Sequence, residues 1–277
     1  NIFVFVLIFK IIIFLKQIIK NMLRNIGFRS HKKETKSLGI IDKKINSNEN
    51  IPLEEILSEE SVIYELKNEN KVLIKYLTKD KVKQMIDYII KEPPEDTAFD
   101  RGHKLPWVCS QLFNIENSPI LKYFYKTNKE LYDEETDNEN KMDIEEDDKN
   151  INKIELLEYL LTFLTSDKEP NYVLCGYFSS LIKTLLNTKP TIILNYFYKV
   201  NKNIIKILLN FSYRESIAEI LNKIFQYDIT VEEYNVEEMD LVRMEMIEEL
   251  FLKIDIDMDN EKLDSISTLI KNLSTEE

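Results

Sequence analysis

The sequence predicts an all-α protein in which antiparallel helix pairs follow one another, an α-solenoid. Three observations lead to this prediction. From about Pro52 onward, apolar residues recur with a period close to 3.6, as they do on one face of a helix. No stretch alternates convincingly with the period of two that a half-buried strand needs. The 277 residues include only four Gly and seven Pro, too few for a fold rich in tight turns.

Two apolar stripes open the helical region. The first consists of Val62, Ile63, Leu66, Leu73, Tyr76 and Leu77, and the second of Val82, Met85, Ile86, Ile89 and Ile90. We expect the second helix to end before Pro93-Pro94, because proline cannot continue a helix and also restricts the residue before it.

The polar stretch EDTAFDRGHK, residues 95–104, is predicted to be a loop, and LPWVCSQLF after it a helix with Pro106 in its first turn. In NSPILKYFYK, Ser118 suits the N-cap and Pro119 the first helical position. The residues Ile120, Leu121, Phe124 and Tyr125 then share one face.

The stretch LCGYFSSLIKTLLNTKPTIILNYF, residues 174–197, belongs to the strongest helix signal of the chain. Four apolar pairs follow one another at intervals of four: Val173/Leu174, Tyr177/Phe178, Leu181/Ile182 and Leu185/Leu186. So wide a stripe predicts a helix that is buried on most of one side. We expect it to end at 187–189 and Pro190 to open the next helix.

Further stripes follow the same period on either side of this stretch. They run through Ile154, Leu157, Leu160, Leu161 and Leu164; Ile204, Ile205 and Leu208; Ile217, Ile220, Leu221, Ile224 and Phe225; Leu241, Met244, Ile247, Leu250 and Phe251; and Leu263, Ile266, Leu269, Ile270 and Leu273. Helices in series with short connections favour an armadillo/HEAT-like solenoid, in which each pair buries its face on its neighbours. The sequence fixes no repeat length, and a globular helical bundle is the alternative.

Charge is concentrated in one segment. Residues 133–150 hold ten acids and two lysines, a net charge of −8 out of −12 for the chain, which leaves −4 elsewhere. Such a segment cannot bury enough apolar surface to fold alone, so we predict an acidic disordered insertion at 133–152, with an acidic docking or phosphorylation segment as the alternative. An acidic chain without a basic stripe is not expected to bind nucleic acid.

The first 21 residues differ from the rest of the chain. Fifteen of the first nineteen are apolar. At roughly −0.3 to −0.6 kcal/mol each, against about +3 for Lys10 and Lys16, the insertion free energy is near zero, so a membrane span is marginal. Met22 offers a start for the chain, and we expect residues 1–21 to be an upstream extension. A membrane anchor is the alternative.

Residues for catalysis are sparse. Cys109 and Cys175 lie in apolar surroundings and are predicted to be buried free thiols, as in a reducing compartment, rather than a disulfide or metal pair. His31 and His103 have no ligand spacing. The sequence lacks GxGxxG, P-loop, GxSxG, HExxH and paired CxxC motifs. We therefore expect a scaffold or adaptor that is not an enzyme, with no catalytic residue, cofactor or metal.

Five motifs in order resemble the SAPS-domain family, the regulatory subunits of protein phosphatase 6-type enzymes. They are an L-E-E-L-L-like segment at 53–57, E-x-x-x-x-N-x-x-L-I-x-F-L at 65–77, I-x-x-E-P at 89–93, a basic element before Pro106 in RGHKLPWVCSQLF, and GYFS at 176–179 followed by Lys189-Pro190. The sequence MLRNIGFRSHKK from Met22 is similar to the short start of that family. The resemblance extends from about residue 23 to residue 272.

The resemblance implies a regulatory subunit that binds a protein phosphatase 6-type catalytic subunit, with further scaffold proteins as additional partners, in the cytoplasm and also in the nucleus. It divides the chain into a flexible segment at 22–50, a first helical part at 51–132 and a continuation at 153–277. Family domains extend further than this sequence, which suggests either the N-terminal part of such a domain or a shortened member. LLNFSYRESI also replaces a usual histidine-containing stretch, which puts the completeness of the binding surface in doubt.

The polar loop 91–104 is the predicted contact surface for the phosphatase, because loops between rigid helices are free to carry function. Its candidate residues are Glu92, Pro93, Arg101, Lys104 and Pro106. The alternative is that its charged residues cap helices or pair with each other. Rival functions are a membrane-anchored adaptor, which would need residues 1–21 for membrane contact, and a trafficking adaptor unrelated to phosphatases.

Overall fold

The computed structural model describes residues 39–48, 50–94, 100–135, 153–165, 169–201, 203–225, 244–245, 247–252 and 260–274. Every regular element in these ranges is a helix, so the predicted all-α class is confirmed. The chain forms two compact units, residues 1–65 and 66–277. The N-terminal extension at 1–21 and most of the acidic segment at 133–152 lie outside the described residues.

In the first unit, helix α2 (Ile40–Ser47) falls within the stretch expected to be flexible, and α3 (Leu53–Leu57) follows it. Lys44 of α2 pairs with Glu55 at 3.0 Å and with Glu59 at 2.7 Å. Ile41, Ile56 and Leu57 are buried. An ion-pair cluster at the surface and an apolar cluster inside therefore hold α2 against the segment that follows it.

The stripe from Val62 to Leu77 forms two short helices, α4 (Val62–Lys67) and α5 (Lys71–Tyr76). Glu69 between them has a φ of 56°, in the left-handed region that a helix cannot use. The side chain of Asn70 then accepts hydrogen bonds from the backbone N–H groups of Val72 and Leu73, at 2.9 and 3.0 Å. This N-cap starts a new helix without changing the apolar spacing.

The second unit continues with α6 (Lys79–Ile90), a π-helical turn η1 (Asp100–Lys104), α7 (Leu105–Phe113), a 3₁₀ helix η2 (Pro119–Phe124) and α8 (Asn128–Glu135). Helix α6 ends before Pro93-Pro94, as predicted. Ser118 occupies the N-cap position of η2, but its side chain makes no capping hydrogen bond. The segment after it is a 3₁₀ helix rather than a full α-helix.

The remaining elements are α9 (Glu155–Leu161), η3 (Thr162–Leu164), α10 (Tyr172–Thr188), α11 (Pro190–Asn195), a π-helical turn η4 (Tyr196–Val200), α12 (Asn203–Asn210), α13 (Glu215–Phe225), a helical stretch at 247–252 and α15 (Asn260–Ser274). Asn171 caps α10, because its side-chain oxygen accepts from the N–H groups of Val173 and Leu174. Pro190 opens α11, as predicted.

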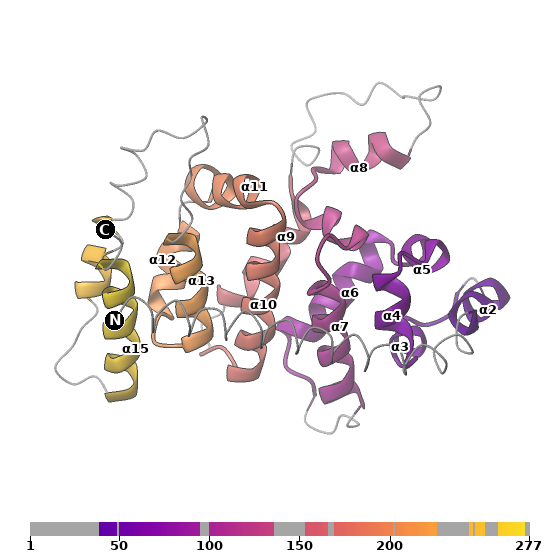
Figure 1. The fold of residues 1–277 in the computed structure, drawn as a ribbon, viewed down its shortest axis with the longest axis horizontal. Coiled ribbons are helices and arrows are strands. Elements are labelled where there is room, and N and C mark those ends of the chain that lie inside the picture. The colour runs from indigo at the N-terminus through magenta and orange to yellow at the C-terminus, as the bar shows by residue number, and fades with distance from the viewer. Residues whose placement is uncertain are drawn as a thin grey trace, which may run out of the picture. The chain divides into compact units, whose positions relative to one another are not determined.

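Within the second unit, α7, α10, α13 and α15 form a row in which each helix contacts the next (Figure 1). Three contacts show that they run in the same direction. Asn114, after α7, bonds to Thr184 in the second half of α10 at 3.1 Å, while Arg214 before α13 pairs with Glu169 before α10 at 2.6 Å. Lys262, at the start of α15, lies 4.8 Å from the ring centroid of Tyr213.

Antiparallel pairs in series would produce such a row, because every second helix then points the same way. Helix α6 packs on α7, and α12 packs on α13. The core between the helices is apolar, and Phe113, Phe124, Phe178 and Phe197 are its largest fully buried side chains. Among the described helices, none is both long enough and apolar enough to cross a membrane.

Candidate functional site

The five predicted site residues lie at one end of the α6–α7 pair. Glu92 and Pro93 follow α6 and are exposed, Arg101 is exposed in η1, and Lys104 is half-buried at the end of that turn. Pro106 is buried in the first turn of α7. Four of the five residues therefore lie at the surface, whereas Pro106 is buried and begins helix α7.

The structure brings the two halves of this loop together. A Cβ atom added to Gly102 would lie 3.9 Å from Cγ of Pro93, so η1 packs beside the residues that follow α6. The Nδ2 of Asn171 donates a hydrogen bond to Oε1 of Glu92 at 3.3 Å. Because Asn171 also caps α10, this contact places the loop next to the start of α10.

Exposed apolar side chains gather where these helices begin. Trp107 in the first turn of α7 is 50% exposed, and Tyr172 and Val173 in the first turn of α10 are 65% and 57% exposed. The sequence predicted Val173 to be part of the buried stripe, but the first turn of α10 carries it to the surface. Aromatic residues and arginine are enriched in protein interfaces, whereas lysine, glutamate and aspartate are depleted there.

A polar cluster joins the starts of α10 and α13. Oε1 of Glu169 accepts hydrogen bonds from Nη2 of Arg214 at 2.6 Å and from the hydroxyl of Tyr213 at 3.0 Å. The guanidinium of Arg214 also lies 5.4 Å from the ring centroid of Tyr213. Burial, and after it the hydrogen bond to Glu169, raises the pKa of Tyr213. Tyr213 therefore stays a hydrogen-bond donor at neutral pH.

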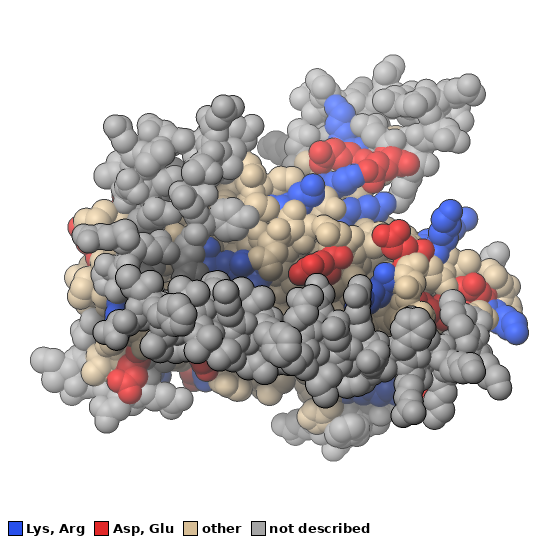
Figure 2. Space-filling model, viewed as in Figure 1, with Lys and Arg blue, Asp and Glu red and all other residues tan. Residues whose placement is uncertain are grey.

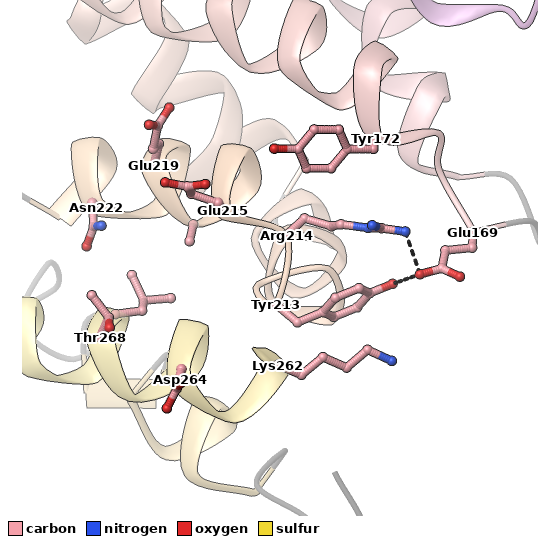
Figure 3. A pocket seen from close by; sticks show the side chains of 12 residues that line it. Glu169, Tyr172, Tyr213, Arg214, Glu215, Glu219, Asn222, Lys262, Asp264 and Thr268 are labelled. Atoms are coloured by element: carbon pink, nitrogen blue, oxygen red, sulfur yellow. Dashed lines mark hydrogen bonds and ion pairs between the residues drawn. The ribbon is translucent and has the colours of Figure 1, made fainter. Parts of the chain in front are cut away.

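This cluster borders a cavity of about 550 Å³ between the start of α10 and helices α13 and α15 (Figure 3). Sequence reasoning missed it because its residues come from three distant segments. Tyr213 and Arg214 were noticed only as a departure from the motif of the resembled family. The sequence held one indication of this cavity. Glu215, Ala218, Glu219 and Asn222 share one face of the predicted helix, and three of these four residues are charged or polar.

We call the surface formed by Glu92, Pro93, Arg101, Lys104, Trp107, Tyr172 and Val173 the N-terminal edge. Elsewhere, on the face drawn in Figure 2, lysines lie close to the acids of α8. Lys122 pairs with Glu134 at 3.5 Å, and Lys126 pairs with the same carboxylate. Those charges are locally compensated, so the N-terminal edge is the better candidate for contact with a partner.

The described residues offer little for metal or covalent chemistry. They contain no group of three or more His, Cys, Asp or Glu that could hold a metal ion. Cys109 and Cys175 are buried thiols that form no disulfide, as predicted. Burial raises the pKa of Cys175 to about 11, which keeps the thiol protonated and unreactive at neutral pH.

The described part of the chain thus belongs to a general class: all-helical proteins in which stacked helices present an exposed edge. Sequence comparison finds three known proteins that are similar to this chain. The chain is 28% identical over 152 residues to serine/threonine-protein phosphatase 6 regulatory subunit 3 of Gallus gallus, a match over 54% of this chain and 14% of that protein. It is 24% identical over 172 residues to regulatory subunits 3-B and 3-A of Xenopus laevis, over 62% of this chain and 17% of each.

The predicted resemblance to phosphatase 6 regulatory subunits is confirmed by these relatives. The chain spans between 14% and 17% of their length. No family model matches the sequence, and no solved structure matches it either.

Proposed function

We propose that this chain acts as a regulatory or scaffolding subunit of a protein phosphatase 6-type serine/threonine phosphatase, binding the catalytic subunit and directing it to substrates. The observation that carries the proposal is the similarity to three proteins named as regulatory subunits of that phosphatase. A rigid helical framework suits this role, because it can hold a catalytic subunit near a chosen substrate. In this proposal the catalysis belongs to the partner and the chain itself is not an enzyme.

We further propose that the N-terminal edge contacts the phosphatase. It combines exposed aromatic groups with an arginine, residue types that are enriched where binding energy concentrates, and a half-buried lysine adds positive charge beside them. The relatives do not favour the alternative of a membrane-anchored or trafficking adaptor.

The test is a pull-down of the full chain on an immobilised phosphatase 6 catalytic subunit. We expect the unaltered chain to be retained, and the double variant Arg101→Glu/Lys104→Glu to bind at least roughly tenfold more weakly, since reversing charges against a complementary partner costs several kcal/mol. Trp107→Ala should also weaken binding, because aromatic anchors dominate interfaces.

The matched control is Lys71→Glu/Lys75→Glu, which makes the same charge change at two exposed positions of α5. It should bind like the unaltered chain, and circular dichroism should show equal helicity for all variants. No retention of the unaltered chain would overturn the proposed function. Equal binding by both double variants would leave the function standing but remove Arg101 and Lys104 from the contact surface.

A further inference from the structure

The residues immediately before α10 are tied to the start of α13. Oε1 of Glu169 accepts from Nη2 of Arg214 at 2.6 Å and from the hydroxyl of Tyr213 at 3.0 Å, as the dashed lines in Figure 3 show. The backbone of Arg214 is fixed, because its carbonyl oxygen accepts a hydrogen bond from the N–H of Ala218 in the first turn of α13. Its side chain is only 25% exposed. Glu169 is therefore held by groups that the fold of α13 places.

The next two residues connect this anchor to the loop after α6. Pro170 is buried. Asn171 caps α10 with its side-chain oxygen, and its side-chain nitrogen donates to Glu92 at 3.3 Å. We call Glu169, Pro170 and Asn171 the α10 strap, because these three consecutive residues have contacts on α13, in the interior, and on both α10 and the loop after α6.

Two exposed apolar residues of the N-terminal edge directly follow the α10 strap. Tyr172 and Val173 are 65% and 57% exposed, so few neighbouring side chains hold them in place. The backbone N–H groups of Val173 and Leu174 bond instead to the side chain of Asn171, at 2.9 and 3.4 Å. The position of this first turn therefore depends on the α10 strap and, through Glu169, on the start of α13.

We propose that Arg214 and Glu169 are positioning residues for the phosphatase contact. Their ion pair fixes the α10 strap, and the strap orders the part of the N-terminal edge formed by Glu92, Tyr172 and Val173, without either residue touching the phosphatase. A surface that is already ordered binds more tightly, because less conformational entropy is lost when the partner arrives. This role rests on the proposed function, since it concerns the same contact.

The stretch LLNFSYRESI then has a function in this protein. It differs from the histidine-containing stretch that is usual in the resembled family, and it supplies both Tyr213 and Arg214. In this proposal the departure does not remove part of the binding surface, but orders a part of it from a distance.

A second ion pair between the same two helices offers a matched comparison. Lys183, in the second half of α10, pairs with Glu219 of α13. The side chains of this pair are 33% and 50% exposed, against 25% and 58% for Arg214 and Glu169. If the edge depended only on how firmly α10 packs on α13, the loss of either pair would affect it alike. The α10 strap predicts an effect only for the pair that includes Glu169.

The experiment measures the affinity of the full chain for immobilised phosphatase 6 catalytic subunit. Arg214→Gln and Glu169→Ala should each weaken binding about two- to fivefold, the range expected for one partly exposed ion pair. The double variant should bind no more weakly than Glu169→Ala, because both residues act through one contact. Arg214→Lys, which keeps the charge, should stay within about twofold of the unaltered chain. The control Lys183→Gln/Glu219→Gln should bind like the unaltered chain.

A second measurement needs no phosphatase. Hydrogen exchange of the isotope-labelled chain, followed by NMR, reports local opening at single amides. The amides of Val173 and Leu174 should exchange at least roughly twofold faster in Arg214→Gln than in the unaltered chain, and at the unaltered rate in the control. Circular dichroism and thermal unfolding show that each variant is folded.

Equal affinity of Arg214→Gln and the unaltered chain would overturn the positioning role and leave the proposed function standing. An equal loss of affinity in the control would do the same, because it would show that only the packing of α10 on α13 matters. No retention of the unaltered chain would instead overturn the proposed function and, with it, any role in binding. The exchange rates of Val173 and Leu174 would then still show whether the ion pair orders the edge.

Discussion

Single residues at the starts of the helices carry several contacts each. Asn171 caps α10 with its side-chain oxygen and donates to Glu92 with its side-chain nitrogen. Two positions earlier, Glu169 accepts from both Arg214 and Tyr213. One short segment therefore links the loop after α6 to the residues before α13.

Cys175 lies one turn further along α10 and gives a prediction at the same scale. Its pKa of about 11 means that about one molecule in a thousand carries the thiolate at pH 8, against about one in ten at the ordinary pKa of 9.0. We expect its alkylation by iodoacetamide at pH 8 to be at least roughly a hundredfold slower in the folded chain than in urea.

Mass spectrometry of tryptic peptides measures this rate, because it assigns the label to Cys175 or Cys109 separately. Cys109 should also label slowly, since it is fully buried. Rapid labelling of Cys175 without denaturant would contradict the burial of its thiol.

Residue spacing alone could not reveal the N-terminal edge. Val173 and Leu174 look alike in the sequence, yet Val173 is exposed and Leu174 is buried, because successive residues of a helix point in different directions. The polar loop was predicted from its composition, but the contact of Glu92 with Asn171 joins residues 79 positions apart, and that of Glu169 with Arg214 joins residues 45 positions apart. Such pairs become visible only when the helices are packed.

At the scale of helices, polar contacts join α6 to α9. Glu155 at the start of α9 pairs with Lys79 and, at 3.3 Å, with Lys83 of α6. The hydroxyl of Tyr159 donates to Asp87. These contacts lie on the surface above the buried apolar faces of the two helices, so they adjust the stability rather than supply most of it.

The ion pair between Glu155 and Lys79 predicts that the stability of the fold depends on pH. The hydrogen bond from Lys79, followed by the other contacts with Lys79 and Lys83, lowers the pKa of Glu155 below its ordinary 4.5. The stabilisation is thus complete above pH 4.5 and is lost as the pH falls through the lowered pKa. Between pH 5 and pH 3, urea denaturation should show a larger loss of stability for the unaltered chain than for Glu155→Gln.

Because the side chain of Glu155 is 42% exposed, solvent screening limits the difference to less than about 1 kcal/mol. The control Glu116→Gln, at an exposed position without such a pair, should follow the unaltered chain. Identical acid profiles for Glu155→Gln and the unaltered chain would mean that the ion pair does not act in solution.

The sequence predicted most of the helices correctly, but it predicted where they begin and end less well. The predicted stripes of α6 and α13 are buried in the structure, and so is most of the α10 stripe, because long periodic segments have one way to hide their apolar face. The stripe at 62–77 was split by Glu69 and Asn70, whose effect is conformational and leaves the spacing intact. The segment after Ser118 became a 3₁₀ helix, which periodicity cannot distinguish from an α-helix over so short a length.

At the scale of the second unit as a whole, α10 lies at the centre of the packing. It contacts α6, α7, α11 and α13, and its Phe178 is fully buried, with the ring of Phe163 at a centroid distance of 5.2 Å. Local damage to α10 should therefore spread to both of its neighbours in the row.

We expect Phe178→Ala to lower the free energy of unfolding by about 3–5 kcal/mol through loss of buried area and creation of a cavity. Hydrogen exchange should then quicken in α7 and α13 together with α10. Leu252→Ala, at a side chain 83% exposed, is the control and should change stability by no more than about 0.5 kcal/mol. Faster exchange in α10 alone would show that its neighbours fold independently.

The common direction of α7, α10, α13 and α15 has an electrostatic consequence. Each helix places roughly half a positive charge at its first turn and half a negative charge at its last, so the positive ends of the row lie along one border, where the end of the antiparallel helix α6 also lies. Glu92, Glu169 and Glu215 lie close to the positive ends, where the backbone itself attracts carboxylates. These carboxylates thus lie beside partly positive helix starts, a contribution to the local potential that counting acidic and basic side chains does not capture.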